Sequence, residues 1–182
     1  MADYRFQRTD NEIQTAFLKL VDQQGFRNVS VSAVTHAALI NRQTFYQHYT
    51  DIYDLSEKMI ENMLLKFESL LKIRGQKNSL KLGIREMEEL ISPQATQLFI
   101  NERNKIKILR QLPLDDRSLD KRLTQIINEY LNNFFKEKIS DFERELLTAV
   151  VFTGINYILA EKKFPNVQQI KRSFEDMNRL FS

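Results

Sequence analysis

The sequence of 182 residues contains no cysteine and no tryptophan, and it has only four glycines, three prolines and two histidines. Without cysteine there is no disulfide framework, no thiolate nucleophile and no cysteine-based metal site, which favours a reducing, cytoplasmic setting. The scarcity of glycine and proline leaves little turn material for a many-stranded sheet. Many Leu, Ile, Glu, Lys and Gln residues instead predict an all-α protein.

Long apolar runs are missing as well. No run reaches the roughly 18 residues that a membrane span needs, and the N-terminal stretch MADYRFQRTDNEI lacks the apolar centre of a signal peptide. The sequence also has no glycine-rich phosphate loop and no histidine beside a serine or an acid pair. We therefore expect no membrane segment, no enzymatic activity, no cofactor and no metal site.

Acidic residues are absent from one window of the chain. Residues 23–50 contain no Asp or Glu, although 24 acids in 182 residues would place three or four there. The same window carries Arg27 and Arg42. An acid-free surface is what contact with phosphates requires, so the window indicates a nucleic-acid interface despite a net charge of only +3.

Capping residues and apolar spacing predict four helices in the first 75 residues. Thr9 and Glu12 form the pattern of a capping box, and Gly25 stands where the helix should end. A short helix should follow Ser30, a second short helix should run from Arg42 to Tyr49, and a long one should begin after Thr50 or Asp51. The polar run Arg74 to Ser79 is the best candidate for a boundary.

Everything after that run is helical by pattern. Ser92 and Pro93 resemble a cap followed by proline at the first helical position, and Ser140 with Glu143 predicts another capping box. The segment from Leu146 to Ala160 is apolar nearly all the way round, so we expect it to be buried on more than one side. Asn166 should cap a final amphipathic helix.

Two short helices joined by a tight turn, behind a longer one, predict a helix-turn-helix whose second short helix enters the major groove. Arg42, Gln43 and Gln47 can present donors to base edges. Thr44, Tyr46 and His48 are better suited to phosphates, while Phe45 and Tyr49 should point inward. On pattern alone, a solvated helical hairpin remains an alternative, as does packing of Tyr46 and His48 against the fourth helix.

The stretch FRNVSVSAVTHAALINRQTFYQHYTDIYDL, preceded by IQTAFLKLVDQQG, resembles the N-terminal DNA-binding region of the TetR family of bacterial transcriptional regulators. The resemblance covers about residues 9–60 and includes the TFYQHY core. It implies an all-helical homodimer with a helix-turn-helix domain in residues 1–55 and an effector-binding and dimerisation domain in residues 56–182. It also implies binding to a palindromic double-stranded operator, most commonly as a repressor, with release by a small molecule.

Three sets of site residues follow from the pattern and the resemblance together. The DNA-binding set is Ser30, Asn41, Arg42, Gln43, Thr44, Tyr46, Gln47 and His48. The effector-binding candidates are Phe67, Phe99, Tyr130, Phe134 and Phe152, for which ordinary core packing is the alternative, and Asn156, which could give a polar anchor. The dimerisation candidates on two C-terminal helices are Leu147, Val151, Ile155, Ile158, Ile170, Phe174, Met177 and Phe181.

The sequence departs from the family pattern at two positions. Leu39 stands at a turn position usually held by glycine, so either the leucine is left-handed at a cost of roughly 1–2 kcal/mol or the turn is built differently. Ile52 stands where the family usually has a phosphate-contacting lysine, which predicts weak non-specific binding and tighter binding by Ile52→Lys.

These departures keep a second function open. A protein with this fold could work as a co-regulator through a protein partner, with little DNA affinity of its own. The near-neutral charge of the N-terminal region supports that alternative, since its bases Arg5, Arg8, Lys19, Arg27 and Arg42 are matched by the acids Asp3, Asp10, Glu12, Asp22 and Asp51. Selection of a DNA sequence by the protein would decide between the two.

Overall fold

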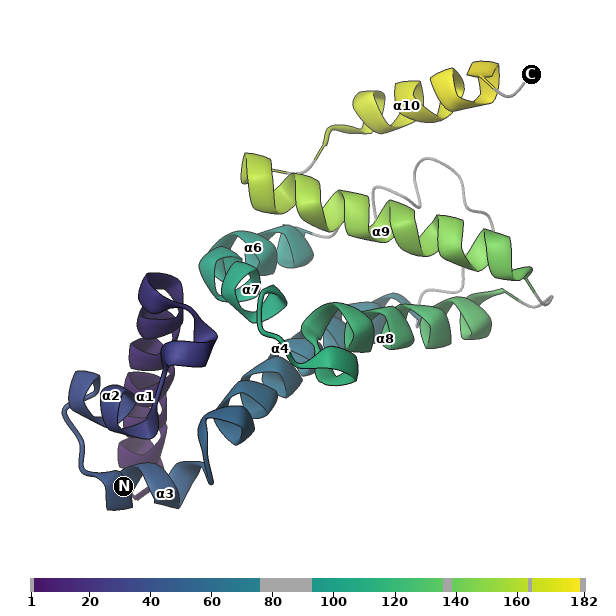
Figure 1. The fold of residues 1–182 in the computed structure, drawn as a ribbon. Coiled ribbons are helices and arrows are strands. Elements are labelled where there is room, and N and C mark those ends of the chain that lie inside the picture. Colours follow the sequence, from purple (N-terminus) through teal and green to yellow (C-terminus); the bar gives the residue numbers. More distant parts are fainter. Residues whose placement is uncertain (1, 76–92, 136–138, 164, 181–182) are drawn as a thin grey trace. The chain divides into compact units, whose positions relative to one another are not determined.

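The computed structural model describes residues 2–75, 93–135, 139–163 and 165–180, and all regular elements in these ranges are helical (Figure 1). This confirms the all-α class. The helices are α1 (Ala2–Gln24), α2 (Val31–Ala37), α3 (Arg42–His48), α4 (Ile52–Gly75), α6 (Pro93–Asn101), α7 (Arg103–Arg110), α8 (Leu119–Phe134), α9 (Asp141–Glu161) and α10 (Val167–Leu180), with short 3-10 turns η1 (Phe26–Asn28) and η2 (Asp115–Arg117).

The chain divides into two compact units. The head unit comprises residues 1–65 and 104–122, and the body unit comprises residues 66–103 and 123–182. The division passes through α4 and adds α7 to the head unit, whereas the expected functional domains meet between residues 55 and 56. The expected boundary at Arg74 to Ser79 falls mostly outside the described residues, because α4 ends at Gly75.

Side-chain caps define the short helices of the head unit. Ser30 caps α2 by accepting a hydrogen bond from the backbone N–H of Ala33 at 3.2 Å. Asn41 caps α3, and Asp51 Oδ1 accepts the N–H of Asp54 at 2.8 Å where α4 begins. Each cap satisfies a donor that a helix N-terminus otherwise leaves unpaired. Gly25, with φ of 77°, ends α1 as the sequence predicted.

The start of α1 was predicted wrongly. The helix begins at Ala2, so Thr9 lies inside it and does not cap it. Glu12, assigned to the capping box, instead forms an i,i+4 ion pair with Arg8 at 3.0 Å. A tertiary contact accounts for the additional turns, since the ring of Phe6 stacks on His48 of α3 with centroids 3.8 Å apart. Such packing stabilises helical residues that local signals leave undecided.

The head unit has a core of its own. The side chains of Phe17, Val34, Phe45, Leu55 and Met59 are fully buried, and they come from α1, α2, α3 and α4. Burying an apolar side chain of this size contributes roughly 1.5–3 kcal/mol. The helix-turn-helix is therefore fixed by apolar contacts from all four helices.

In the body unit, α6 packs against α9, and Phe67 stacks on Phe99 with centroids 5.1 Å apart. The capping box of Ser140 and Glu143 is present at the start of α9. Asn166 caps α10, accepting the N–H of Gln169 at 2.8 Å, and α10 runs back in the direction opposite to α9 (Figure 1).

The burial expected for Leu146 to Ala160 is only partly observed. Ile155, Ile158 and Leu159 are buried, but Leu146, Val150 and Val151 are 38–44% exposed. Phe142 is 76% exposed on the same helix, and Phe174 of α10 is 41% exposed. Within the described ranges, no helix is both long enough and apolar enough to cross a membrane.

Candidate DNA interface

One face of α3 carries four long polar side chains. Arg42, Gln43, Tyr46 and Gln47 are exposed, and they lie at i, i+1, i+4 and i+5, which places them together on a helix surface. Phe45 and Tyr49 face the opposite way and are 0% and 4% exposed. The helix therefore presents a polar face whose orientation is fixed by an aromatic one.

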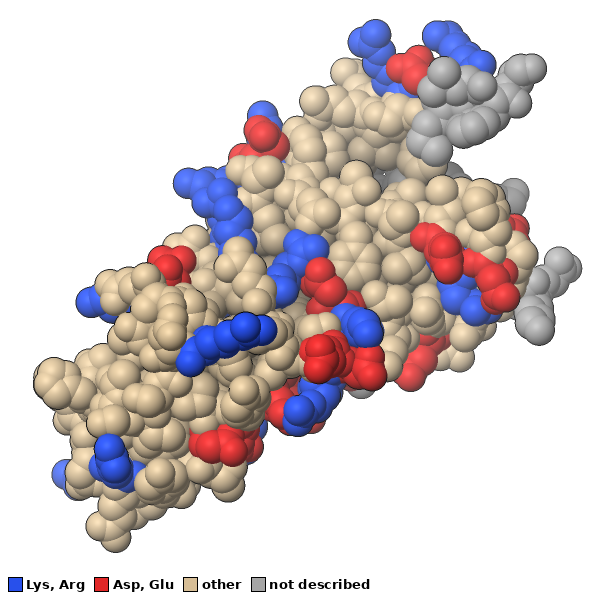
Figure 2. All heavy atoms as spheres, viewed as in Figure 1, with Lys and Arg blue, Asp and Glu red and all other residues tan. Residues whose placement is uncertain are grey.

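The chemistry of this face suits DNA. Arginine can donate two hydrogen bonds to guanine, and glutamine can donate to and accept from adenine. Tyr46, which is 56% exposed, offers a hydroxyl to phosphate or base. Figure 2 shows the head end, at the lower left, as mostly uncharged surface with scattered Lys, Arg, Asp and Glu. The recognition helix α3 itself contains no acid. The face can therefore make directional contacts without an acid repelling phosphates.

Three members of the expected DNA-binding set act as caps or cap partners in the structure. Ser30 caps α2, and Asn41 Oδ1 accepts both the N–H of Thr44 at 2.7 Å and the hydroxyl of Thr44 at 3.0 Å. Ser30 and Asn41 are exposed, and Thr44 is half-buried. Their bonds define the first turns of the two short helices, and phosphate contact by these side chains stays a prediction.

The structure contradicts the expected phosphate contact of His48. Its side chain is 3% exposed, lies under the ring of Phe6, and has Nδ1 3.6 Å from Asp10 Oδ1. Burial lowers the pKa of His48 below 6.5, and this effect outweighs the attraction of Asp10 for the protonated form. His48 is therefore an interior residue, because the longer α1 covers it.

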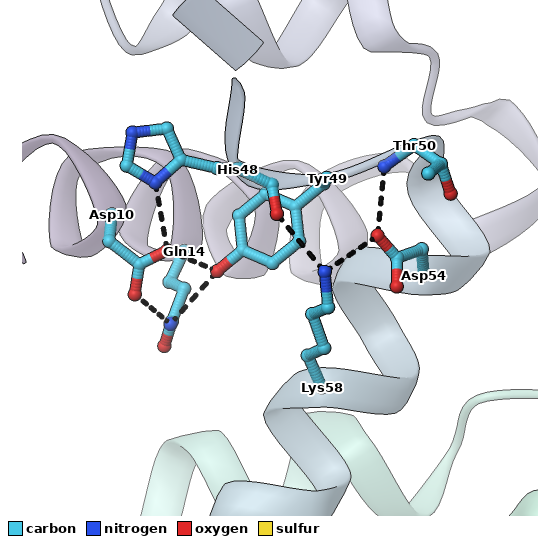
Figure 3. A network of polar contacts seen from close by, with 7 residues as sticks. All are labelled: Asp10, Gln14, His48, Tyr49, Thr50, Asp54 and Lys58. Atoms are coloured by element: carbon cyan, nitrogen blue, oxygen red, sulfur yellow. Dashed lines mark hydrogen bonds and ion pairs between the residues drawn. The ribbon is translucent and has the colours of Figure 1, made fainter. Parts of the chain in front are cut away.

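A polar network joins α1 to the carboxyl end of α3 (Figure 3). The Tyr49 hydroxyl donates to Asp10 Oδ1, and the Gln14 amide donates to Asp10 Oδ2 at 2.8 Å and to the Tyr49 oxygen at 3.2 Å. Burial and the bond to Asp10 raise the pKa of Tyr49. Lys105 of α7 donates to Gln14 Oε1 at 3.0 Å. The phenol therefore stays neutral and holds α3 against α1.

A second group of contacts joins the same end of α3 to α4. Lys58 Nζ donates to the backbone carbonyl of His48 at 3.1 Å and to Asp54 Oδ2 at 3.0 Å. Asp54 Oδ2 also accepts the backbone N–H of Thr50 at 2.8 Å. Burial opposes ionisation of Asp54, but the bonds from Thr50 and Lys58 hold its pKa below 3.8.

Sequence reasoning missed Phe6, Asp10, Gln14 and Lys58. Phe6 was missed because the first helix was expected to begin at Thr9, and Asp10 was missed because its partners His48 and Tyr49 lie far along the chain. The partners of Gln14 come from α3 and α7, which no local pattern connects. Asp54 and Lys58 stand four residues apart, so their pairing could have been found from helical spacing.

The two departures from the family pattern have different outcomes. Leu39 has φ of 54° and is 92% exposed, so the left-handed alternative is confirmed. Ile52 is only 7% exposed. The expectation that Ile52→Lys tightens DNA binding is withdrawn, because that position is occupied by a buried apolar side chain where an ammonium group would be costly.

The effector-binding candidates lie in the body unit. Phe67 and Phe99 are buried against each other, and Tyr130 stacks on Phe134 with centroids 6.0 Å apart. Phe152 is half-buried on α9, and Asn156 is exposed there. One stacked pair joins α4 to α6, and the other lies along α8. Ordinary core packing would produce the same contacts. Effector binding by this set therefore stays a prediction.

The dimerisation candidates divide into exposed and interior positions. Val151 and Phe174 are exposed, and Leu147 and Ile170 are half-buried. Ile155 and Ile158 are 7% and 4% exposed, so they are interior residues of the subunit and not free for a partner. The exposed apolar stripe of α9 is instead Phe142, Leu146 and Val150. Phe181 and the side chain of Met177 lie outside the described residues.

No protein-family model matches the chain. A curated relative, the uncharacterized HTH-type transcriptional regulator YxbF of Bacillus subtilis (strain 168), is 31% identical over 91 residues. The matched stretch is 50% of this chain and 23% of that protein, so it spans about a quarter of the relative's length.

Solved structures cover almost the whole chain. A putative TetR-family transcriptional regulator from Syntrophomonas wolfei str. Goettingen superposes with a TM-score of 0.66 at 16% identity, covering 96% of this chain and 95% of that one. The chain has the TetR-family fold. A transcriptional regulator of the TerR/AcrR family from Aquifex aeolicus VF5 gives 0.59 at 16% identity, covering 96% and 99%. The sequence resemblance over residues 9–60 had already indicated the helix-turn-helix of the head unit.

Proposed function

We propose that this protein is a DNA-binding transcriptional regulator that acts as a repressor. It binds a palindromic operator as a homodimer and is released by a small-molecule effector. The observation that carries the proposal is the exposed face of Arg42, Gln43, Tyr46 and Gln47 on a helix fixed from behind by Phe45 and Tyr49. The TetR-family fold and the similarity to an HTH-type regulator support it.

Sequence reading rests on Arg42, Gln43 and Gln47. Each good bidentate pair with a base edge contributes roughly 1–3 kcal/mol of discrimination. A single seven-residue helix can contact only a few base pairs. Two such helices related by a twofold axis would read a palindrome, with half-sites separated by about one helical turn of DNA.

Dimerisation rests on the exposed apolar residues of α9 and α10. Phe142, Leu146 and Val150 recur every four residues along one side of α9, and Phe174 is exposed on α10. Two helices from each subunit would bury these side chains in a four-helix arrangement. An isologous interface of this kind supplies the symmetry that a palindromic operator requires.

The effector is expected to be apolar or aromatic, because the candidate residues Phe67, Phe99, Tyr130 and Phe134 are aromatic. Release would follow if an effector displaced α4, since α4 begins directly after the recognition helix and continues into the body unit. If effector-bound and free dimers held their recognition helices at the same separation, this route would be wrong.

The test is selection from a pool of random DNA duplexes by the purified protein near physiological salt, with sequencing of the retained duplexes. Enrichment of a palindrome supports the proposal, and Arg42→Ala should then relax discrimination at one position of each half-site. A folded dimer that enriches no sequence would favour the second candidate, a co-regulator acting through a protein partner. The observation that favours this alternative is the near-neutral charge of the N-terminal region, where five bases are matched by five acids.

A further inference from the structure

The carboxyl end of the recognition helix α3 is held by a side chain from another helix. A helix of seven residues leaves its last carbonyls without partners in the helix, and its C-terminus carries partial negative charge. Lys58, in the second turn of α4, donates to the carbonyl of His48, the last residue of α3. An ammonium group at this point satisfies both the hydrogen-bonding and the charge requirement.

Lys58 contacts two successive residues directly and is linked to a third through Asp54. Its Nζ is 3.1 Å from the His48 carbonyl oxygen and 5.3 Å from the centre of the Tyr49 ring. Through Asp54, bonded at 3.0 Å, it is linked to the N–H of Thr50 (Figure 3). One cation on α4 therefore organises the chain where it leaves α3, at the point where α1 already contacts it through Asp10 and Tyr49.

Discrimination between DNA sequences requires that α3 be held accurately in place. Directional contacts with base edges need side chains held within about 0.5 Å and 10–20° of the productive geometry. Contacts with phosphates tolerate displacement, because they depend mainly on charge. A residue that fixes the end of α3 should therefore affect discrimination between sequences more than affinity for DNA in general.

We propose that Lys58 is a positioning residue for DNA reading. It fixes the carboxyl end of the recognition helix to α4, and Asp54 orients it. This inference rests on the proposed function, because it assigns Lys58 a role in sequence discrimination by α3. Because Lys58 belongs to α4, this contact makes sequence discrimination dependent on the position of α4.

The experiment compares the full-length protein with Lys58→Met, which keeps a side chain of similar length and removes the ammonium group. Affinity is measured for the selected palindrome and for a scrambled duplex over a range of salt concentrations. We expect affinity for the palindrome to fall at least about tenfold, the size of one hydrogen bond to a charged group. Affinity for the scrambled duplex and the salt slope for it should be unchanged, and Lys58→Arg should restore much of the discrimination.

Lys121→Met is the charge-matched control, because Lys121 is an exposed residue of the head unit paired with Asp116. A parallel loss of affinity for both duplexes, or a salt slope lowered by about 0.9 per subunit, would overturn the proposal and make Lys58 a phosphate contact. Full discrimination in Lys58→Met would overturn it as well. A wild-type protein that selects no sequence would instead refute the proposed function.

Two further measurements keep the test decisive if Lys58→Met does not fold. Asp54→Asn weakens the orientation of Lys58 while keeping its charge, and it should reduce discrimination in the same direction by a smaller factor. Amide hydrogen exchange at Tyr49, whose N–H donates to the Phe45 carbonyl at the end of α3, should be faster in Asp54→Asn than in wild type, with exchange of α2 amides unchanged. Unaltered discrimination and unaltered exchange in a folded Asp54→Asn protein would refute the positioning role.

Discussion

The head unit and the C-terminal helices of the body unit use apolar residues in different ways. The phenylalanine of α3 and the aliphatic side chains in the first turns of α4 are buried within the head unit, with Phe45 and Leu55 fully buried. Along α9 and α10, by contrast, Phe142, Leu146, Val150 and Phe174 are 38–76% exposed. The head unit completes its own core, whereas the C-terminal helices have apolar surface that we propose a second subunit covers. Contiguous exposed apolar surface of this kind is typical of an interaction site.

The largest effect should come from the head core. Phe45→Ala removes a fully buried aromatic side chain and should lower the free energy of unfolding by about 3–5 kcal/mol. Urea denaturation followed by circular dichroism would measure the loss, which should not depend on protein concentration. Phe142→Ala, at a 76% exposed position, is the comparison. Its loss should be smaller and should depend on protein concentration, because we propose that this side chain lies in the dimer interface. Equal losses in the two variants would contradict the contrast between the regions.

The complementary change is Val150→Glu in the exposed stripe of α9. Two carboxylates placed in an apolar interface should raise the dimer dissociation constant by about 100-fold, or roughly 2.7 kcal/mol. Analytical ultracentrifugation over a range of concentrations would measure it. Asn132→Glu, on the exposed side of α8, adds the same charge elsewhere and should leave dimerisation unchanged. Val150→Glu protein that remains fully dimeric would exclude this stripe from the interface.

On the exposed face of α3, Arg42→Ala should cost about 1–3 kcal/mol of discrimination at one base position of each half-site. Folding stability should be nearly unchanged, because Arg42 is exposed. Competition binding with operator variants would measure the discrimination. Lys19→Ala removes a positive charge from the exposed side of α1 as the matched control. A uniform loss across all sequences would show that Arg42 contacts phosphate and not a base.

The pH dependence of stability tests the assignment of His48 to the interior. Its pKa in the folded protein is lowered from 6.5, so the unfolded chain binds the proton more readily. The free energy of unfolding should therefore be highest above about pH 6.5 and fall as the pH is lowered toward the pKa of the folded state. Denaturation at about pH 8 and about pH 5.5 would measure this, and His48→Gln should flatten the dependence. If the free energy of unfolding of His48→Gln depended on pH as strongly as that of wild type, another residue would be responsible for the dependence.

The smallest effect is expected at the turn of the helix-turn-helix. Leu39→Gly removes the strain of a left-handed leucine, offset partly by the greater freedom of glycine in the unfolded chain, and should stabilise the head by up to about 1 kcal/mol. Leu39→Asn should give an intermediate gain, because asparagine tolerates this conformation. Thermal unfolding would measure both. Destabilisation by glycine would show that the exposed leucine makes a favourable contact.

Local signals account for much of the fold. Ser30, Ser140 with Glu143, and Asn166 cap helices where the sequence predicted, because a cap depends only on residues three positions apart. The helix α3 begins at Arg42 as predicted, although its cap Asn41 was expected only to contact DNA. The inward direction of Phe45 and Tyr49 was predicted for the same reason, since helical spacing places i and i+4 on one side. The start of α1 was not predicted, because Phe6 is stabilised by stacking on His48, more than 40 residues away in the chain.

What the sequence alone determined is the helical class, most of the helix starts and the polar face of α3, all of which depend on neighbours within one or two turns. The tertiary structure decided which side of α9 is buried, since an all-round apolar helix has no periodicity from which to choose. It also decided that His48 is interior and that Lys58 reaches the end of α3. These depend on contacts between helices, whose partners are set by packing and not by spacing along the chain.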